Sequence, residues 1–314
     1  MKKIVTACVL MVVNFTLAQT SVVQDAKGET SLPMGKQGVV AINSKDESIS
    51  FSYGIYLDKP DTITTSPITR YNYGGIAVKG KGKNGLINIV KNDDFQYDGS
   101  IGLFFFQDNI VSDNTTVQWY GSADFLFSQF KLYDSSPEIS FDKQVYDENS
   151  KGFKLAAGTN IYGALGTCVP YVLGIQVNGG QKNNTGGLKQ IEISEIEMQT
   201  DPLTGQIRYI EKNQQNAYSF ADYSDSLWYS NFNVDLGPQL FTQYLLLVHS
   251  RWSVMEGRKP QWNPAIGLYF TKTGAPKEIV AGIQVQTLDW SNSAMSEKSR
   301  GERTVFNIVA GYSF

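Results

Sequence analysis

The sequence predicts an all-β fold, an antiparallel transmembrane β-barrel of about 12 strands, and three observations support this prediction. Stretches of about ten residues alternate between apolar and polar side chains and are separated by turn-forming residues. The 314 residues include 17 Tyr, 17 Phe and 29 Gly, but only 18% are charged. After residue 18 no apolar run approaches the roughly 18 residues of a membrane-spanning helix. The mean hydropathy of −0.24 fits strands whose inner faces are polar.

Residues 1–18 have the organisation of a secretory signal peptide. Lys2 and Lys3 give a positive start, residues 4–13 are apolar, and Thr-Leu-Ala at 16–18 forms a small-residue cleavage site. Removing this segment changes the formal net charge from −3 to −5, because it contains two lysines and no acid. Residues 19–47 are polar and weakly patterned. We expect them to form a periplasmic arm or a plug segment in the lumen, with the barrel at 48–314.

The strands of the barrel are identified by alternation. Ile49, Phe51 and Tyr53 share one face of a strand, and Ser50 and Ser52 share the other, because side chains alternate with period two. Two of the twelve expected strands, 71–82 and 138–146, have the weaker patterns. The twelve are expected near 48–57, 71–82, 97–105, 117–127, 138–146, 153–161, 169–177, 226–236, 240–254, 264–273, 278–290 and 302–314.

The connections differ in length, which predicts their side of the membrane. Short turns are expected at 134–137, 165–167, 237–239 and 273–277. Longer polar loops are expected at 58–69, 178–187, 255–263 and 291–301. With both termini in the periplasm, all the short turns fall inside and all the long loops outside, as is usual in bacterial barrels.

The stretch 189–212 does not have a clean lipid-facing side. It carries Glu192, Glu195 and Glu197 among isoleucines, followed by a turn at 201–205. Because a carboxylate facing lipid is costly, we expect a hairpin within an extracellular excursion. The wall has 14 strands instead of 12 if this hairpin joins it.

The last strand carries the clearest signal of the chain. Thr304, Phe306, Ile308, Ala310, Tyr312 and Phe314 fall on one face, with aromatic rings at both ends. At ~3.3 Å per residue and a tilt of roughly 40°, Phe306 and Phe314 lie about 20 Å apart vertically, near the ~25 Å apolar band of a membrane barrel.

This strand resembles the closing strand of Gram-negative outer-membrane β-barrel proteins, porin-like in character, which typically finish on an aromatic residue. The resemblance implies location in the cell outer membrane and contact with its lipid. It also implies assembly by the barrel-assembly machinery, for which Tyr312 and Phe314 would form the C-terminal signal.

Residues opposite the apolar faces are expected to line the lumen. These candidate residues are Lys154, Asn160, Gln176, His249, Arg251, Arg303 and Asn307. Arg303 is expected near the outer mouth. The five tryptophans fall mostly near strand ends, where indole anchors a barrel at the membrane interface. Trp262 has the alternative of stacking on a sugar.

The residues that would carry chemistry are few. After the signal, Cys168 and His249 are the only cysteine and histidine, too few for a zinc site, so we expect no metal. Outer-membrane hydrolases place histidine and serine at H-x-S on one strand face, whereas His249 precedes Ser250 directly. We therefore expect no catalytic residue and no enzyme.

A glycine-rich segment at 80–85 fits the pattern G-x-G-x-x-G of dinucleotide-binding folds. Such a site needs a long helix that crosses back to a parallel strand, and 86–90 is too short for one. We interpret the segment as a basic periplasmic turn and expect no cofactor. The acidic net charge also excludes nucleic acid as a partner.

The favoured function is a passive or substrate-selective pore for small solutes. The alternative is a structural or interaction barrel whose loops or turns bind an envelope protein. An outer-membrane hydrolase is the remote third hypothesis. Composition and pattern leave all three open, because a barrel of this size encloses either a narrow channel or a packed interior.

Overall fold

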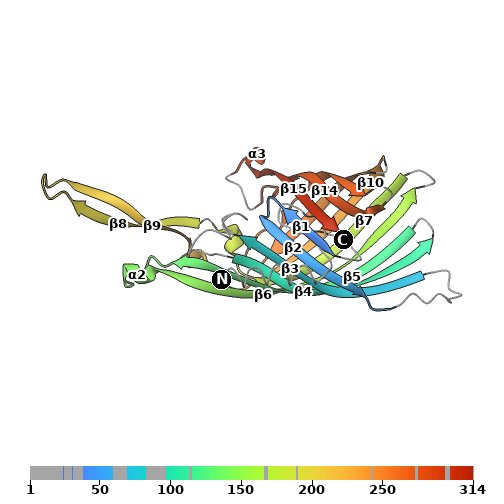
Figure 1. Ribbon diagram of the computed structural model, residues 1–314, viewed down its shortest axis with the longest axis horizontal. Coiled ribbons are helices and arrows are strands. Elements are labelled where there is room, and N and C mark those ends of the chain that lie inside the picture. Colours follow the sequence, from blue (N-terminus) through green and yellow to red (C-terminus); the bar gives the residue numbers. More distant parts are fainter. Residues whose placement is uncertain are drawn as a thin grey trace, which may run out of the picture.

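The computed structural model is a closed antiparallel β-barrel (Figure 1). The structure describes residues 24, 30, 38–58, 69–82, 97–112, 115–165, 169–188, 190–241, 243–272, 275–293 and 298–313. Twelve strands form the wall. They are β1 (Val39–Asn43), β2 (Ser48–Tyr56), β3 (Thr69–Gly82), β4 (Tyr97–Ser112), β5 (Thr115–Tyr133), β6 (Val145–Leu165), β7 (Val169–Lys182), β10 (Leu227–Leu240), β11 (Tyr244–Met255), β13 (Ala265–Lys272), β14 (Ala275–Thr287) and β15 (Thr304–Ser313).

The ring closes between the first and last strands of the wall. β1 pairs antiparallel with β15 in a register that places Val39 opposite Ser313 and Asn43 opposite Val309. Every other neighbour in the ring is also antiparallel, so each wall strand is paired on both sides. Closure matters in lipid, which offers no hydrogen-bonding partner to the backbone of a free edge.

The two faces of the wall differ as the alternation predicts. On β7, the inward residues Val172, Gln176 and Asn178 are buried, whereas Val177 between them is exposed. The same division holds on β15, where Asn307 and Val309 are buried. Exposed outward side chains of that strand are Phe306, Ile308 and Tyr312. The outer surface is therefore apolar and the inner surface mostly polar.

The predicted count of twelve is confirmed, but two of the strands are not those predicted. β1 lies at 39–43, inside the segment predicted to be an arm or plug. The predicted strand at 138–146 is instead a turn, the short helix α2 (Phe141–Gln144) and the beginning of β6. β6 is one strand of 21 residues that absorbs the predicted strand at 153–161. The two errors cancel in the count because one strand was missed and one was added.

The same two errors reverse the predicted direction of β2 to β5. We call the end where Val39 meets Ser313 the C-terminal end, and the opposite end the loop end. Asp58 and Thr69, which bound the 58–69 connection, lie at the C-terminal end, and the 134–137 turn lies at the loop end, so both predictions of side relative to the C-terminus were wrong. Residues 80–82 of the glycine-rich segment, predicted to be a periplasmic turn, are the last of β3 at the loop end, and 83–85 lie outside the described residues.

The predicted hairpin exists and does not join the wall. β8 (Gln190–Thr200) and β9 (Ile207–Ser219) form an antiparallel pair that projects away from the barrel at the left of Figure 1. Only Leu132 and Tyr133 at the end of β5 pair with β9, in parallel, at Tyr218 and Ser219. The wall therefore has 12 strands and not 14.

The remaining elements are short and lie between wall strands. They are η2 (Thr185–Gly187), η3 (Phe220–Asp222), β12 (Gln261–Trp262), which pairs with β11, and α3 (Arg300–Arg303). α3 begins with a capping box, in which Ser299 and Glu302 satisfy each other's backbone N–H groups. Within the described residues, no helix has the length and apolar character needed to cross a membrane.

Candidate functional site

The candidate site is the interior of the barrel, where the structure places six of the seven candidate lumen residues. Five are buried side chains on the inward faces of wall strands: Asn160, Gln176, His249, Arg251 and Asn307. Lys154, the sixth, is half-buried and lines an interior cavity. Arg303 is also buried, but it lies on α3 and donates to the backbone carbonyls of Lys298 and Asp289 in the β14–β15 connection. The structure distributes the seven along the barrel and does not gather them at one point, because they belong to β6, β7, β11, α3 and β15.

One polar network crosses the inner face of β3 to β6. Gln118 donates from Nε2 to Asp108 Oδ1 and to the Tyr73 hydroxyl, both at 2.7 Å. Asn160 Nδ2 donates to Gln118 Oε1 at 2.8 Å. All four side chains are buried. Because each of the four side chains forms a hydrogen bond with another of them, the network stabilises one arrangement of the four strands.

A second network joins β7, β10 and β11. Gln176 Oε1 accepts hydrogen bonds from Asn178 at 2.8 Å and from Asn233 at 2.9 Å. Farther along β10, the Asp235 carboxylate contacts His249 Nδ1 across the β10–β11 pair. Asp235 is 0% and His249 3% exposed. This pair is held away from solvent, where a polar contact contributes more to stability than it does at the surface.

His249 and Ser250 lie on opposite faces of β11, unlike the histidine and serine of the H-x-S arrangement. His249 faces inward to Asp235, whereas Ser250 is the next residue and lies on the other face of β11. There Ser250 Oγ accepts a hydrogen bond from Trp262 Nε1 at 2.6 Å. Among the described residues, no group of three or more histidine, cysteine and acidic side chains is placed to hold a metal ion.

At the loop end, a carboxylate in the β1–β2 turn binds two lysines of β3. Asp46 Oδ2 lies 2.5 Å from Lys79 Nζ, and Oδ1 lies 3.0 Å from Lys81 Nζ. Burial raises the pKa of Asp46, but attraction to Lys79 and Lys81 outweighs it and leaves the pKa below its ordinary value.

Acid is therefore expected to weaken this end of the barrel. Because the pKa of Asp46 is lowered in the folded state, its carboxylate stabilises the fold at any pH above its pKa in the unfolded chain, about 3.9. This stabilisation is lost as the pH falls through the pKa of the folded state. We expect the difference in free energy of unfolding between wild type and Asp46→Asn to be constant from pH 7 to 5 and to shrink below about pH 4. Denaturant titration of both proteins at each pH measures it. A difference that is unchanged at pH 3 contradicts the assignment.

A residue of the predicted arm or plug lies inside the barrel near this cluster. Gln24 is buried; its Oε1 accepts from Asn43 at 3.3 Å and its backbone carbonyl accepts from Asn307 at 3.1 Å. Asn307 also donates to Gln284 at 3.4 Å. Gln24 therefore contacts β1 and β15 from within the lumen.

A cavity of about 160 Å³ lies in the interior beside Gln24. Its polar lining includes Lys79, Asp124, Lys154 and Gln176. Its apolar side is aromatic and includes Phe104, Phe106 and Tyr120. The Phe106 ring stacks on those of Tyr73 and Tyr120 with centroids 5.1 and 5.5 Å apart. The space admits a few water molecules or a small solute.

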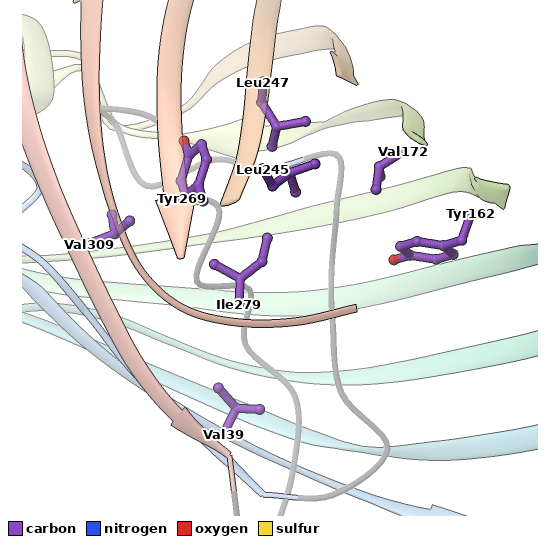
Figure 2. Close-up of a cluster of buried hydrophobic side chains, with 8 residues drawn as sticks. All are labelled: Val39, Tyr162, Val172, Leu245, Leu247, Tyr269, Ile279 and Val309. Carbon is purple, nitrogen blue, oxygen red and sulfur yellow. The ribbon is translucent and has the colours of Figure 1, made fainter. Parts of the chain in front are cut away.

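Toward the C-terminal end the interior becomes hydrophobic (Figure 2). One buried cluster contains Val39, Tyr162, Val172, Leu245, Leu247, Tyr269, Ile279 and Val309. Val39 is on β1 and Val172 on β7, which are six strands apart in either direction around the ring. The cluster therefore draws side chains from opposite walls, and it occupies the lumen at the end where a pore would have to continue.

Sequence reasoning missed Asp235, Asp46 and Lys79. The first had a detectable signal, since Asn231, Asn233 and Asp235 alternate with Phe232 and Val234. Asp46 had no detectable signal in the sequence, because its turn lies in the segment 19–47, where no strand was predicted. Of the predicted C-terminal signal, Tyr312 is exposed on the outward face, and Phe314 lies outside the described residues.

Comparison with known proteins gives structural likenesses only. No protein-family model matches the sequence, and no curated protein matches it. The β-domain of the Bordetella autotransporter BrkA is 8% identical, with 88% of this chain and 96% of that chain covered and a TM-score of 0.35. The translocator domain of NalP from Neisseria meningitidis is 10% identical over 88% and 85%, with a TM-score of 0.37. The ferric enterobactin receptor PfeA from Pseudomonas aeruginosa is 12% identical over 80% and 44%, with a TM-score of 0.27.

Proposed function

We propose that this chain is a barrel of the bacterial outer membrane that presents the β8–β9 hairpin to a protein partner and performs no covalent chemistry. The membrane location is supported by the outer face of the wall. Large apolar side chains are exposed there on many strands, among them Leu103, Leu155 and Ile283. An exposed apolar surface of this extent is unfavourable in water and favourable in lipid.

The proposed location predicts a strong effect of the C-terminal residue on assembly. If the last strand is the assembly signal, deletion of Phe314 should lower the amount of folded protein in the outer membrane at least tenfold. Burying one such ring is worth roughly 1.5–3 kcal/mol, so refolding into detergent should survive the deletion. Membrane fractionation and heat-modifiable gel mobility measure the two effects. Wild-type amounts of the truncated protein in the membrane contradict the signal.

The observation that carries the proposed interaction role is an exposed apolar face on the hairpin. Met198 pairs with Tyr209, and Thr200 with Ile207, so these side chains share a face with Ile196. Ile196, Met198, Ile207 and Tyr209 are each more than half exposed. On the other face of the same segment, Gln199 lies opposite Arg208 and Glu197 lies opposite Ile210. A two-stranded ribbon with one uncovered apolar face gains by docking onto a partner.

The charges of the hairpin indicate which kind of partner fits. β8 has three glutamates, Glu192, Glu195 and Glu197, and its edge away from β9 pairs with no described strand. A second copy added antiparallel to this edge would bring glutamates close to glutamates, which is unfavourable. A partner strand with basic side chains can pair with the glutamate-bearing edge, and its apolar side chains can cover the apolar face.

Site-specific photo-crosslinking in living cells tests this role. A photoreactive residue at Met198, on the apolar face, should give one adduct with an envelope protein, and the same residue at Gln199 should give little. The substitutions Ile196→Ser and Tyr209→Ser should reduce the Met198 adduct at least tenfold while the barrel keeps its heat-modifiable mobility. An adduct formed only with a second copy of this chain, or equal adducts from both faces, overturns the proposal.

A pore for small solutes is the second candidate, and the interior cavity with Lys79, Asp124 and Lys154 in its lining favours it. The hydrophobic cluster at the C-terminal end argues for the closed barrel instead. Conductance in planar bilayers distinguishes the two, because a closed interior gives no steps. Steps that change their ion selectivity in Lys154→Glu would establish the pore.

A further inference from the structure

The loop end carries a row of aromatic rings on the outer face of β10 to β12. Phe232 and Trp252 lie with ring centroids 5.6 Å apart, and Trp252 stacks on Trp262 at 6.2 Å and 11°. Trp262 meets Trp290 edge to face at 6.1 Å. Phe232, Trp252 and Trp290 remain about two-fifths exposed. The four rings form a row along the circumference of the wall, and we call this row the aromatic shelf.

Hydrogen bonds hold the shelf in place. Trp262 is fixed to β11 by its bond from Nε1 to Ser250, and the Trp290 N–H donates to the Trp262 carbonyl at 2.7 Å. Ser293 Oγ donates to the Pro260 carbonyl at 2.7 Å, which joins the β11–β12 connection to the β14–β15 connection. These bonds join the described parts of the two connections to each other above the wall.

Four exposed cations belong to these two connections. Arg258 and Lys259 lie in the first, Lys298 and Arg300 in the second, and the Arg300 guanidinium lies 4.5 Å from the centre of the Trp290 ring. Two acids of these connections accept backbone hydrogen bonds: Glu256 from the Trp228 N–H and Glu302 from the Ser299 N–H. Glu302 is also attracted to Lys298, so it offsets part of the charge of that cation. The buried Asp289 carboxylate accepts from Ser293. This basic group contrasts with the net acidic chain.

On the other side of the shelf, toward the C-terminal end, the outer wall is apolar. Val248 pairs with Ile266, and both are exposed on the outward face together with Ile283. The order along the barrel axis is therefore apolar wall, aromatic shelf, basic rim. A lipid presents the matching order of acyl chains, interface and charged headgroup.

We propose that this surface binds a phosphorylated lipid of the outer leaflet, with acyl chains on the wall around Val248 and phosphate at the rim formed by Arg258, Lys259, Lys298 and Arg300. Guanidinium and ammonium groups donate charge-assisted hydrogen bonds to phosphate, and arginine does so with two parallel bonds. The stack of Arg300 on Trp290 holds one guanidinium at the height where a headgroup lies.

Binding of lipid A to the full chain in detergent micelles tests the site. Lipid A with its two phosphates should bind, and the same lipid after enzymatic removal of the phosphates should bind much more weakly. The double variant Lys298→Gln, Arg300→Gln should weaken binding of the phosphorylated form by about 25-fold, from about fivefold per cation. The matched control Lys143→Gln, Lys151→Gln removes two exposed cations elsewhere and should change affinity less than twofold.

Three results overturn the site: equal affinity for the dephosphorylated lipid, equal loss in the control variant, or displacement of the lipid by inorganic phosphate at equal concentration, which indicates a free-anion site. The inference rests on the proposed membrane location but not on the hairpin. Insertion into liposomes and crosslinking at Met198 are scored separately. Failed lipid A binding with intact insertion and crosslinking therefore refutes this site alone.

Discussion

Replacing both Leu245 and Leu247 by alanine is expected to give the largest loss of stability of any conservative change in the barrel. Both side chains are buried, at 0% and 1% exposed, in the cluster that fills the C-terminal end of the lumen. Truncating a buried leucine costs about 2–5 kcal/mol, from lost burial and from the space left behind. We expect the free energy of unfolding to fall by roughly 4–8 kcal/mol for the pair.

The neighbouring packing limits relaxation at this position. The Tyr269 ring lies against Gly267 and Gly282, where an added Cβ would meet it, so the ring is held over two strands and does not move freely into the vacated space. We therefore also expect the double variant to be leakier than wild type in planar bilayers.

Urea titration of folded protein in lipid vesicles measures the stability, and single-channel recording measures the leak. Val248→Ala is the matched control, because Val248 lies beside both leucines on β11 but faces outward and is exposed. The control should lose less than about 1.5 kcal/mol and remain closed. A double variant as stable as the control would show that the cluster does not support the wall.

Replacing Asp235 by alanine is expected to have the second largest effect. Its carboxylate contacts His249 Nδ1, and both side chains are buried on paired strands. Removing one member of a buried polar pair takes this contact from the other, which stays desolvated. This costs about 3–5 kcal/mol when the pair is charged and about 1–3 kcal/mol when it is neutral.

A double-mutant cycle separates this pair from general packing. If the contact carries the cost, Asp235→Ala and His249→Ala together should destabilise the barrel by less than the sum of the two single changes, with a coupling of at least about 1 kcal/mol. Ser253→Ala, also inward on β11, is the packing control. Strictly additive effects at 235 and 249 would refute the pairing as a source of stability.

The sequence was sufficient to predict the barrel architecture, because a membrane barrel imposes a period of two on the side chains of every strand. Parity alone placed Asn160, Gln176 and His249 on the inner face. Parity could not fix the number of wall strands, because β1 has only five residues and the beginning of β6, with the residues before it, reads like a separate strand. Orientation depends on counting strands, so these two local errors reversed the direction of four strands between them.

Alternation by itself therefore determined the class of fold and the inward and outward faces, and it identified a hairpin at 189–212 without deciding whether that hairpin joins the wall. Only the tertiary structure decided that Val39 and Val172 meet in one cluster across the lumen, that Asp46 reaches Lys79, and that Asp235 reaches His249. The physical reason is that a strand's own pattern is local, whereas contact across a barrel depends on the register and curvature of all twelve strands together. The pattern specifies which side chains enter the lumen, and ring closure specifies which of them meet.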